Sequence, residues 1–138
     1  MAKNSVFPYT ESQVEIWPVA ATTAPGTALQ SASGQPGVAL TGSGDYTAST
    51  TVGPYTISGF DRGGVGLEAR QVSAATDGTW EFPVAGGSAT TAQNTLVYFN
   101  DGDLTLTADG AKPFGKANLP QDYVVNGTTL PVKIGVFA

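Results

Sequence analysis

The sequence predicts an all-β protein, a compact β-sandwich or barrel of about eight short strands. Three observations favour this class. Apolar and polar residues alternate in many short segments, as a half-buried strand requires. Turn-forming residues recur about every ten positions, and no window keeps the i, i+3, i+4, i+7 apolar spacing of an amphipathic helix. The length of 138 residues suits one domain that buries a single core.

In the first half of the chain, four segments show the strand pattern, and three of them place large apolar side chains on one face. The segments are residues 13–20 (Val14 and Ile16), residues 36–41, which follow the turn cluster SASGQ, residues 52–60 (Tyr55 and Ile57) and residues 65–72 (Val65, Leu67 and Ala69). Period-two alternation of this kind predicts strands with one face toward a core.

The second half continues the pattern. Strands are predicted over residues 79–85 (Trp80, Phe82 and Val84), in two runs on either side of Asp101-Gly102, and over residues 131–138 (Val132, Ile134 and Val136). Asp-Gly is favoured where a two-residue hairpin turn requires positive φ. Asp101, Asp103 and Asp109 offer calcium-type oxygen ligands, but no Glu closes such a loop at its twelfth position, so a hairpin is expected.

Residues 1–12 fall outside this rhythm. They predict an extended N-terminal arm ahead of a single β-rich domain over residues 13–138, and no partner strand is evident for them. Phe7 and Tyr9 flank Pro8 in this arm. Such a cluster on a terminal arm is usually either disordered or anchored on a neighbouring molecule. Aromatic residues are enriched among interface anchors, so we favour the anchor.

Two glycine-containing motifs are interpreted as turns. Residues 61–66 (DRGGVG) resemble a phosphate loop, but no helix follows them, as such a loop requires. Asn126-Gly127-Thr128 fits a glycosylation acceptor. Because no secretory signal is evident, a tight turn between strands explains it better.

Composition narrows the classes of function. The chain has no cysteine and no histidine, so it lacks thiolate chemistry, disulfides and the commonest general base and metal ligand. Eleven acidic and six basic residues give a net charge of -5, which disfavours phosphate neutralisation on nucleic acid. No apolar run is long enough for a membrane helix or a signal peptide. We expect no cofactor, metal, nucleic acid or membrane, and synthesis in the cytoplasm.

A small hydrolase is the least favoured class. Without histidine, a serine nucleophile lacks its usual base, and neither G-x-S-x-G nor S-x-x-K occurs. Carboxylate pairs for glycoside hydrolysis stay formally open among Glu11, Glu15, Glu68 and Glu81. Glu68 and Glu81 are expected on the polar faces of amphipathic strands, which is the usual place for solvated charge. The sequence therefore predicts binding without catalysis.

The order of features resembles the small capsid decoration (cement) proteins of tailed bacteriophages, a domain-of-unknown-function family, in the version carried by actinobacterial phages. The likeness covers nearly the whole chain. Its motifs are MAKN, SGQPGVALT, TVGPYTISGFDRGGVG, DGTWEFPVAGG, NTLVYFNDGDLTLTADGAKPFGKA and PVKIGVFA. These motifs are structural, and the family has no active-site motif to transfer.

The resemblance implies a β-tulip-like body, usually a homotrimer, on the outer surface of the expanded head in the virion. There it would bridge subunits of the major capsid protein against the pressure of packaged DNA. The arm would lie on the shell. Carried over to this chain, that role falls to residues 1–10, with Phe7 and Tyr9 as anchors. We expect Phe7, Pro8, Tyr9 and Trp17 to be the capsid-contact residues.

One alternative stays open, a virion-surface adhesion module that binds carbohydrate. In that case exposed Trp17, Tyr46 and Tyr55 would stack on sugar rings. Binding to decoration-free heads or to cell-wall polysaccharide separates the two hypotheses.

Overall fold

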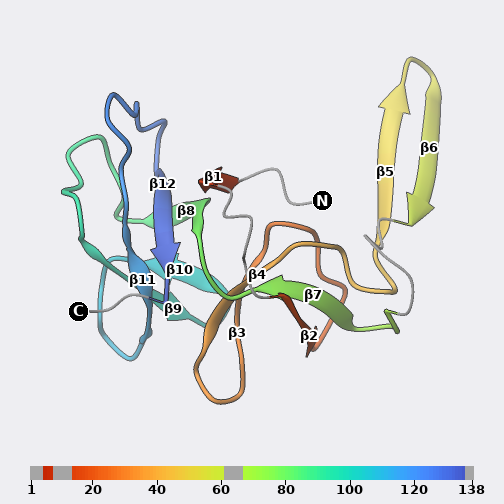
Figure 1. Ribbon diagram of the computed structural model, residues 1–138. Helices are drawn as coiled ribbons and strands as arrows, with labels where there is room; N and C mark the ends of the chain where they lie inside the picture. Colours follow the sequence, from red (N-terminus) through yellow and green to blue (C-terminus); the bar gives the residue numbers. More distant parts are fainter. Residues whose placement is uncertain (1–4, 8–13, 61–66, 136–138) are drawn as a thin grey trace. The chain divides into compact units, whose positions relative to one another are not determined.

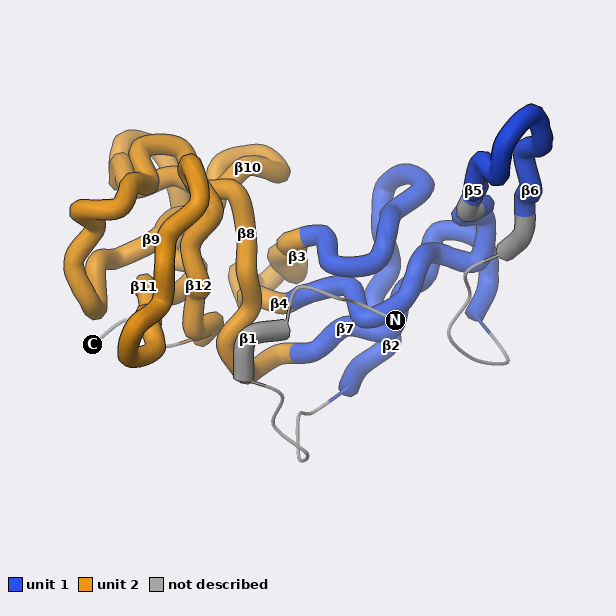
Figure 2. The backbone as a smooth tube through the Cα atoms, turned by 90° about the horizontal axis from the view of Figure 1, so that it is seen from above, with its two compact units in different colours: residues 1–3, 14–27, 38–75 blue, residues 4–13, 28–37, 76–138 orange. Residues whose placement is uncertain are grey.

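The computed structural model describes residues 5–7, 14–60 and 67–135, and these residues confirm the all-β prediction. They form twelve strands, where the sequence predicted about eight, and no helix (Figure 1). The chain divides into two compact units, built mainly from residues 14–27 and 38–75 in one and residues 28–37 and 76–138 in the other (Figure 2). The predicted boundary at residue 12 lies outside the described residues.

The second unit contains a closed five-stranded barrel. Its strands follow the order β8–β10–β9–β11–β12, and β12 pairs back with β8. All pairs are antiparallel except β10 with β8, which is parallel. Closure gives each of the five strands a partner on both sides, which is how small barrels avoid unpaired strands. The bounds are β8 (Thr79–Ala85), β9 (Leu96–Asn100), β10 (Asp103–Thr105), β11 (Lys112–Ala117) and β12 (Thr129–Ile134).

A short strand, β1 (Ser5–Phe7), is added to the barrel at β8, with Ser5 opposite Trp80 and Phe7 opposite Thr79. The sequence offered no partner for this part of the predicted arm, and the structure supplies one. Because β12 already lies along one edge of β8 over the same residues, β1 occupies the other edge.

The barrel core is aromatic at its centre. The buried Phe114 ring meets Phe82 edge to face, with centroids 5.7 Å apart, and stacks on Phe99 at 6.0 Å. Both arrangements are favourable for aromatic pairs. Trp80, Phe82 and Val84 of β8 are all buried, so the predicted inward face of this strand is confirmed.

The predicted hairpin at Asp101-Gly102 is confirmed. β9 and β10 are antiparallel, and Asn100 and Asp103 form the closing pair. Asp101 (φ 49°) and Gly102 (φ 97°) both adopt positive φ, as a type I′ turn requires. Asn126-Gly127-Thr128 is also a turn, with Gly127 at φ 65°.

Gly102→Val should therefore destabilise the barrel by about 1–2 kcal/mol, because a β-branched residue resists the left-handed region. A Cβ at Gly102 would meet no neighbouring atom, so the loss would come from the backbone alone. Urea unfolding measures it. Asp101→Asn is the control and should leave stability nearly unchanged, because Asn tolerates positive φ. Equal losses in both variants would contradict the assignment.

A four-stranded sheet follows the order β2–β7–β4–β3, and β5 and β6 form a separate two-stranded sheet. Within the first unit, β2 is antiparallel to β7, and β5 is antiparallel to β6. The bounds are β2 (Val14–Pro18), β3 (Ala28–Gln30), β4 (Pro36–Ala39), β5 (Thr47–Val52), β6 (Tyr55–Phe60) and β7 (Gln71–Ala75).

Two strand predictions are wrong in position. The segment predicted over residues 65–72 begins its strand only at Gln71, because Arg70 takes a left-handed φ of 58° and turns the chain. The single strand predicted over residues 52–60 is instead the turn and second strand of a hairpin. Gly53 at φ 59°, followed by Pro54, fits the first central position of a type II′ turn. Residues 61–66 and Val136 lie outside the described residues.

Candidate contact surfaces

The acidic side chains with resolved partners act as hydrogen-bond acceptors in the fold. Asp45 accepts bonds from the Ser43 hydroxyl (2.5 Å), the Thr22 hydroxyl (3.2 Å) and the Arg70 N–H (3.3 Å). The Ser43 bond is the largest cause that lowers the pKa of Asp45. The Ser43 hydroxyl therefore donates a hydrogen bond to a structural carboxylate, and this carboxylate connects loops of the first unit.

Glu81 has a similar structural role in the barrel. It accepts a 2.6 Å hydrogen bond from the Tyr123 hydroxyl. Burial and this bond to a carboxylate raise the pKa of Tyr123 to about 12. Within the described part of the chain, no group of three or more acidic residues is placed to hold a metal ion. Glu11 lies outside that part.

The Tyr123–Glu81 bond predicts a loss of stability at high pH. The folded pKa lies above the ordinary value of 10.0, so its stabilisation is present below pH 10 and is lost as the pH rises toward 12. Tyr123→Phe should show a smaller decrease across this window than the parent protein. Urea unfolding at pH 9 and pH 11.5 measures the difference. Equal pH dependence in both proteins would contradict the assignment.

The structure corrects one predicted contact residue. Trp17 is only 8% exposed, and its Nε1–H donates to the Glu15 carboxylate (2.7 Å), so the expectation that Trp17 is exposed is wrong. A buried indole presents little surface to a shell or a sugar. Phe7 lies at the end of β1, and Pro8 and Tyr9 lie outside the described residues.

Two apolar residues of β2 are exposed to solvent, and both belong to the face of the strand that does not carry Trp17. Val14 is 56% and Ile16 61% exposed, on the face opposite Trp17. Strand β2 is at the end of its sheet, so no described strand pairs with its outer edge. We name Val14 and Ile16, with this edge, the β2 edge surface.

The backbone of β2 also points outward at these residues. The Val19 N–H donates to the Arg70 carbonyl (2.8 Å), in continuation of the β2–β7 pairing. Alternate residues of an antiparallel strand direct their backbone groups to opposite edges. The backbone N–H and C=O groups of Trp17 therefore point toward β7, whereas those of Val14 and Ile16 point toward the outer edge of β2.

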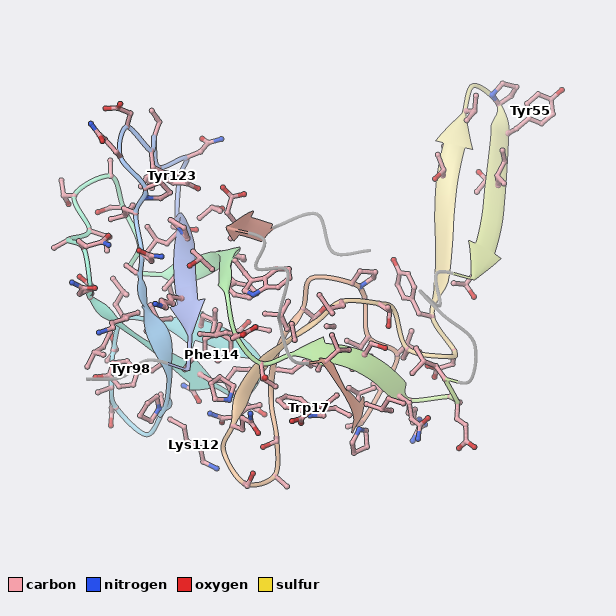
Figure 3. The ribbon with its side chains drawn as sticks, viewed as in Figure 1. Trp17, Tyr55, Tyr98, Lys112, Phe114 and Tyr123 are labelled. Atoms are coloured by element: carbon pink, nitrogen blue, oxygen red, sulfur yellow. The ribbon has the colours of Figure 1, made fainter. Side chains whose placement is uncertain are left out.

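The β5–β6 hairpin forms a second apolar surface. Val52 is 58%, Tyr55 72% and Ile57 62% exposed, and the register places all three on one face. The Tyr55 ring projects from the turn end of the hairpin (Figure 3). We name these three residues the hairpin face.

The other face of the hairpin carries hydroxyl groups. Thr51 is paired with Thr56, and Ser49 with Ser58, so both pairs lie on the side opposite the hairpin face. Residues 46–60 include no charged side chain. Tyr46, the other candidate for sugar stacking, is partly buried next to β5.

Sequence reasoning placed Tyr55 and Ile57 on a common face but did not find the hairpin. The usable signal was Gly53-Pro54, flanked by two uncharged runs of alternating residues. The exposure of Val14 and Ile16 could not be predicted from the sequence. One face of β2 carries Val14 and Ile16 and the other carries Trp17, so the alternation does not show which face is buried.

Comparisons with protein-family models, with curated proteins and with solved structures give no match to the chain. No helix in the described part of the chain has the length and apolar character needed to cross a membrane.

Proposed function

We propose that the protein is a bacteriophage capsid decoration protein. It binds the outer surface of the expanded head, bridges major capsid protein subunits and stabilises the shell against packaged DNA. The observation that carries the proposal is the β2 edge surface, where an open strand edge and two exposed apolar side chains follow directly after the predicted arm. The motif resemblance supplies the identity of the shell.

Strand addition gives this edge a way to bind. An extended segment of a partner can pair with an open edge, so that backbone hydrogen bonds give affinity and alternate side chains give specificity. On β2, Val14 and Ile16 are both the residues with outward backbone groups and the exposed apolar residues. Phe7, Pro8 and Tyr9 of the arm are proposed as contacts of their own with the shell, whereas Trp17 is buried.

Avidity would strengthen a modest contact. A stable protein contact buries about 1,200–2,000 Å² in total. In a homotrimer, as the resemblance implies, several copies of the β2 edge surface engage the shell at once, so the second and third contacts form at high effective concentration. Such binding needs neither a metal nor a catalytic group.

The alternative function is a carbohydrate-binding module on the virion surface. The observation that favours it is Tyr55, whose ring is 72% exposed at the turn end of the hairpin. Exposed aromatic rings present an apolar face on which sugars can stack. Trp17 has the largest of the three rings expected to stack on sugars, and its burial removes it from such a site.

Purified protein added to expanded heads that lack decoration should bind in a saturable manner, with no binding to cell-wall polysaccharide. Val14→Lys with Ile16→Lys should weaken head binding at least about tenfold, because burial of one such side chain contributes roughly 1.5–3 kcal/mol. Co-sedimentation with heads measures both effects.

Val124→Lys is the matched control, because Val124 is 83% exposed and belongs neither to the β2 edge surface nor to the predicted arm. It should bind heads like the parent protein. Polysaccharide binding without head binding would favour the alternative. Equal head binding by the β2 variant and the control would contradict the assigned surface.

A further inference from the structure

We propose that Asn126 is a site of covalent self-modification, where the side-chain amide is lost as ammonia and aspartate or isoaspartate takes the place of asparagine. The observation that carries the proposal is the turn before β12, where an exposed asparagine amide is adjacent to an unpaired glycine N–H. Water is the only co-reactant. The reaction needs neither a shell nor a partner, so it is independent of the proposed function.

The turn exposes both reacting groups. Asn126 and Thr129 are the closing pair of a two-residue hairpin turn, with Gly127 and Thr128 at its centre. Gly127 has a φ of 65°, which fits the first central position of a type II′ turn. Asn126 and Gly127 are exposed, and an added Cβ at Gly127 would meet no atom within 4 Å. Solvent therefore reaches the amide and the neighbouring N–H.

Hydrogen bonds do not hold either group in place. In the part of the chain that the structure describes, the Asn126 side chain and the Gly127 N–H have no hydrogen-bond partner. The backbone bond that closes the turn runs from the Thr129 N–H to the Asn126 carbonyl, and at 3.3 Å it is long and therefore weak. Local opening of such a turn requires little free energy, and it lets the amide and the N–H approach each other.

The reaction is an intramolecular substitution at the Asn126 amide. The deprotonated Gly127 nitrogen forms a bond to Cγ of Asn126, and the Cγ–Nδ2 bond breaks. Nδ2 leaves as ammonia, with the proton that the Gly127 nitrogen lost, and a five-membered succinimide ring remains. Water then opens the ring at Cγ to give aspartate, or at the backbone carbonyl carbon of residue 126 to give isoaspartate. Glycine favours the attack because it has no side chain to hinder the approach.

Asn118 is a protected asparagine in the same chain. Its amide nitrogen donates to the Thr79 hydroxyl (2.8 Å), and its carbonyl oxygen accepts from the Gln93 amide (3.0 Å). The next N–H, that of Leu119, donates to the Gln93 side-chain oxygen (2.6 Å). These bonds must break before the same ring can form at Asn118. Of the five asparagines in the chain, only Asn126 precedes a glycine.

The isoaspartate product alters the closure of the barrel. Its main chain passes through the former side chain, so the backbone of the turn is longer by one methylene. The turn leads into β12, and the Thr128 carbonyl accepts a hydrogen bond from the Val84 N–H of β8 (3.1 Å). A longer backbone does not preserve the Asn126–Thr129 pair, so the pairing of β8 with β12 weakens at this end.

Peptide mapping by mass spectrometry tests the site. The protein is incubated in mildly alkaline buffer, either folded or unfolded in guanidinium chloride, and is then digested with trypsin. Cleavage after Lys116 and Lys133 releases Asn118 and Asn126 in one peptide, so fragment ions compare them directly. Asn126 should convert in the folded protein nearly as fast as in the unfolded chain. Folding should slow Asn118 at least about tenfold, because the net contribution of even one hydrogen bond is close to such a factor.

Two variants separate the chemistry from other roles of the turn. Asn126→Gln should abolish conversion at this position, because a glutamine would have to form a larger ring. Thr128→Ala keeps the Asn-Gly pair and should convert at the parent rate. Asn126→Asp carries the new charge on an unchanged backbone, so it should unfold at a urea concentration close to that of the parent, whereas the isoaspartate form should unfold at a lower one.

An intact Asn126 in the folded protein, under conditions that convert the unfolded chain, would overturn the proposal, because the turn would then protect the amide. Conversion of Asn118 in the folded protein as fast as that of Asn126 would also overturn it, since the hydrogen bonds would then have no influence. An isoaspartate form as stable as Asn126→Asp would contradict the predicted effect on the β8–β12 pairing.

Discussion

Phe114→Ala is expected to lower the free energy of unfolding of the barrel by about 3–5 kcal/mol, the usual cost of truncating a buried phenylalanine. The Phe114 side chain is fully buried and holds two aromatic partners, Phe82 at 84° to its ring plane and Phe99 at 18°. Its removal leaves a cavity among strands β8, β9 and β11. Since these strands belong to one closed ring, the cavity should not be filled by a local shift.

Urea unfolding followed by Trp80 fluorescence measures this loss, in a Trp17→Phe background so that the barrel alone is observed. Tyr55→Ala is the matched control, because it truncates an aromatic side chain that is 72% exposed. Its effect on the barrel should stay within about 0.5 kcal/mol. Similar losses in the two variants would contradict the assignment of Phe114 to the core.

Gly115→Ala should also destabilise the barrel strongly, for a steric reason. A Cβ at Gly115 would lie 2.3 Å from the Lys133 carbonyl oxygen and 3.0 Å from the Ile134 Cα, both on the paired strand β12. Backbone atoms in a closed ring cannot move aside as a flexible side chain can. We expect a loss of about 1–3 kcal/mol or more, the usual cost of overpacking.

Gly110→Ala separates this steric effect from the general effect of adding a side chain. Gly110 has a positive φ of 66°, and an added Cβ there meets no atom within 4 Å. Its loss should be about 1 kcal/mol, from backbone strain alone. Both losses are obtained from urea unfolding. A Gly115→Ala protein as stable as the Gly110→Ala protein would contradict the close approach of β11 and β12.

The elements predicted correctly are those determined by local sequence. Residues 79–85 alternate strictly and match the bounds of β8. Asp101-Gly102 specifies its own turn type, and the hairpin follows from it. In both cases a few adjacent residues determine backbone conformation, so no information about distant strands is needed.

The predictions that failed depend on tertiary context. On β2, alternation separates Val14 and Ile16 from Trp17 but does not say which face is inward, and the sheet buries the larger indole. The turn at Arg70 requires a left-handed arginine, for which the sequence gives no signal. Closure of the barrel through the parallel β8–β10 pair joins segments separated by the β9 hairpin.

The candidate site shows the same division. From the sequence we predicted contact residues in place of a catalytic cluster, and we named Phe7, Pro8, Tyr9 and Trp17. We did not find Val14, Ile16 or the hairpin face, because exposure of an apolar residue is a property of the folded chain. The two surfaces that carry the proposals therefore come from burial and strand order.

The central claim is that this protein stabilises a capsid by binding across its outer surface. The most direct test is the temperature at which filled, decoration-free heads release their DNA, measured with and without a saturating amount of the protein. We predict a clear rise in that temperature with the parent protein and a smaller rise with the Val14→Lys, Ile16→Lys variant. An unchanged release temperature at saturation would contradict the claim.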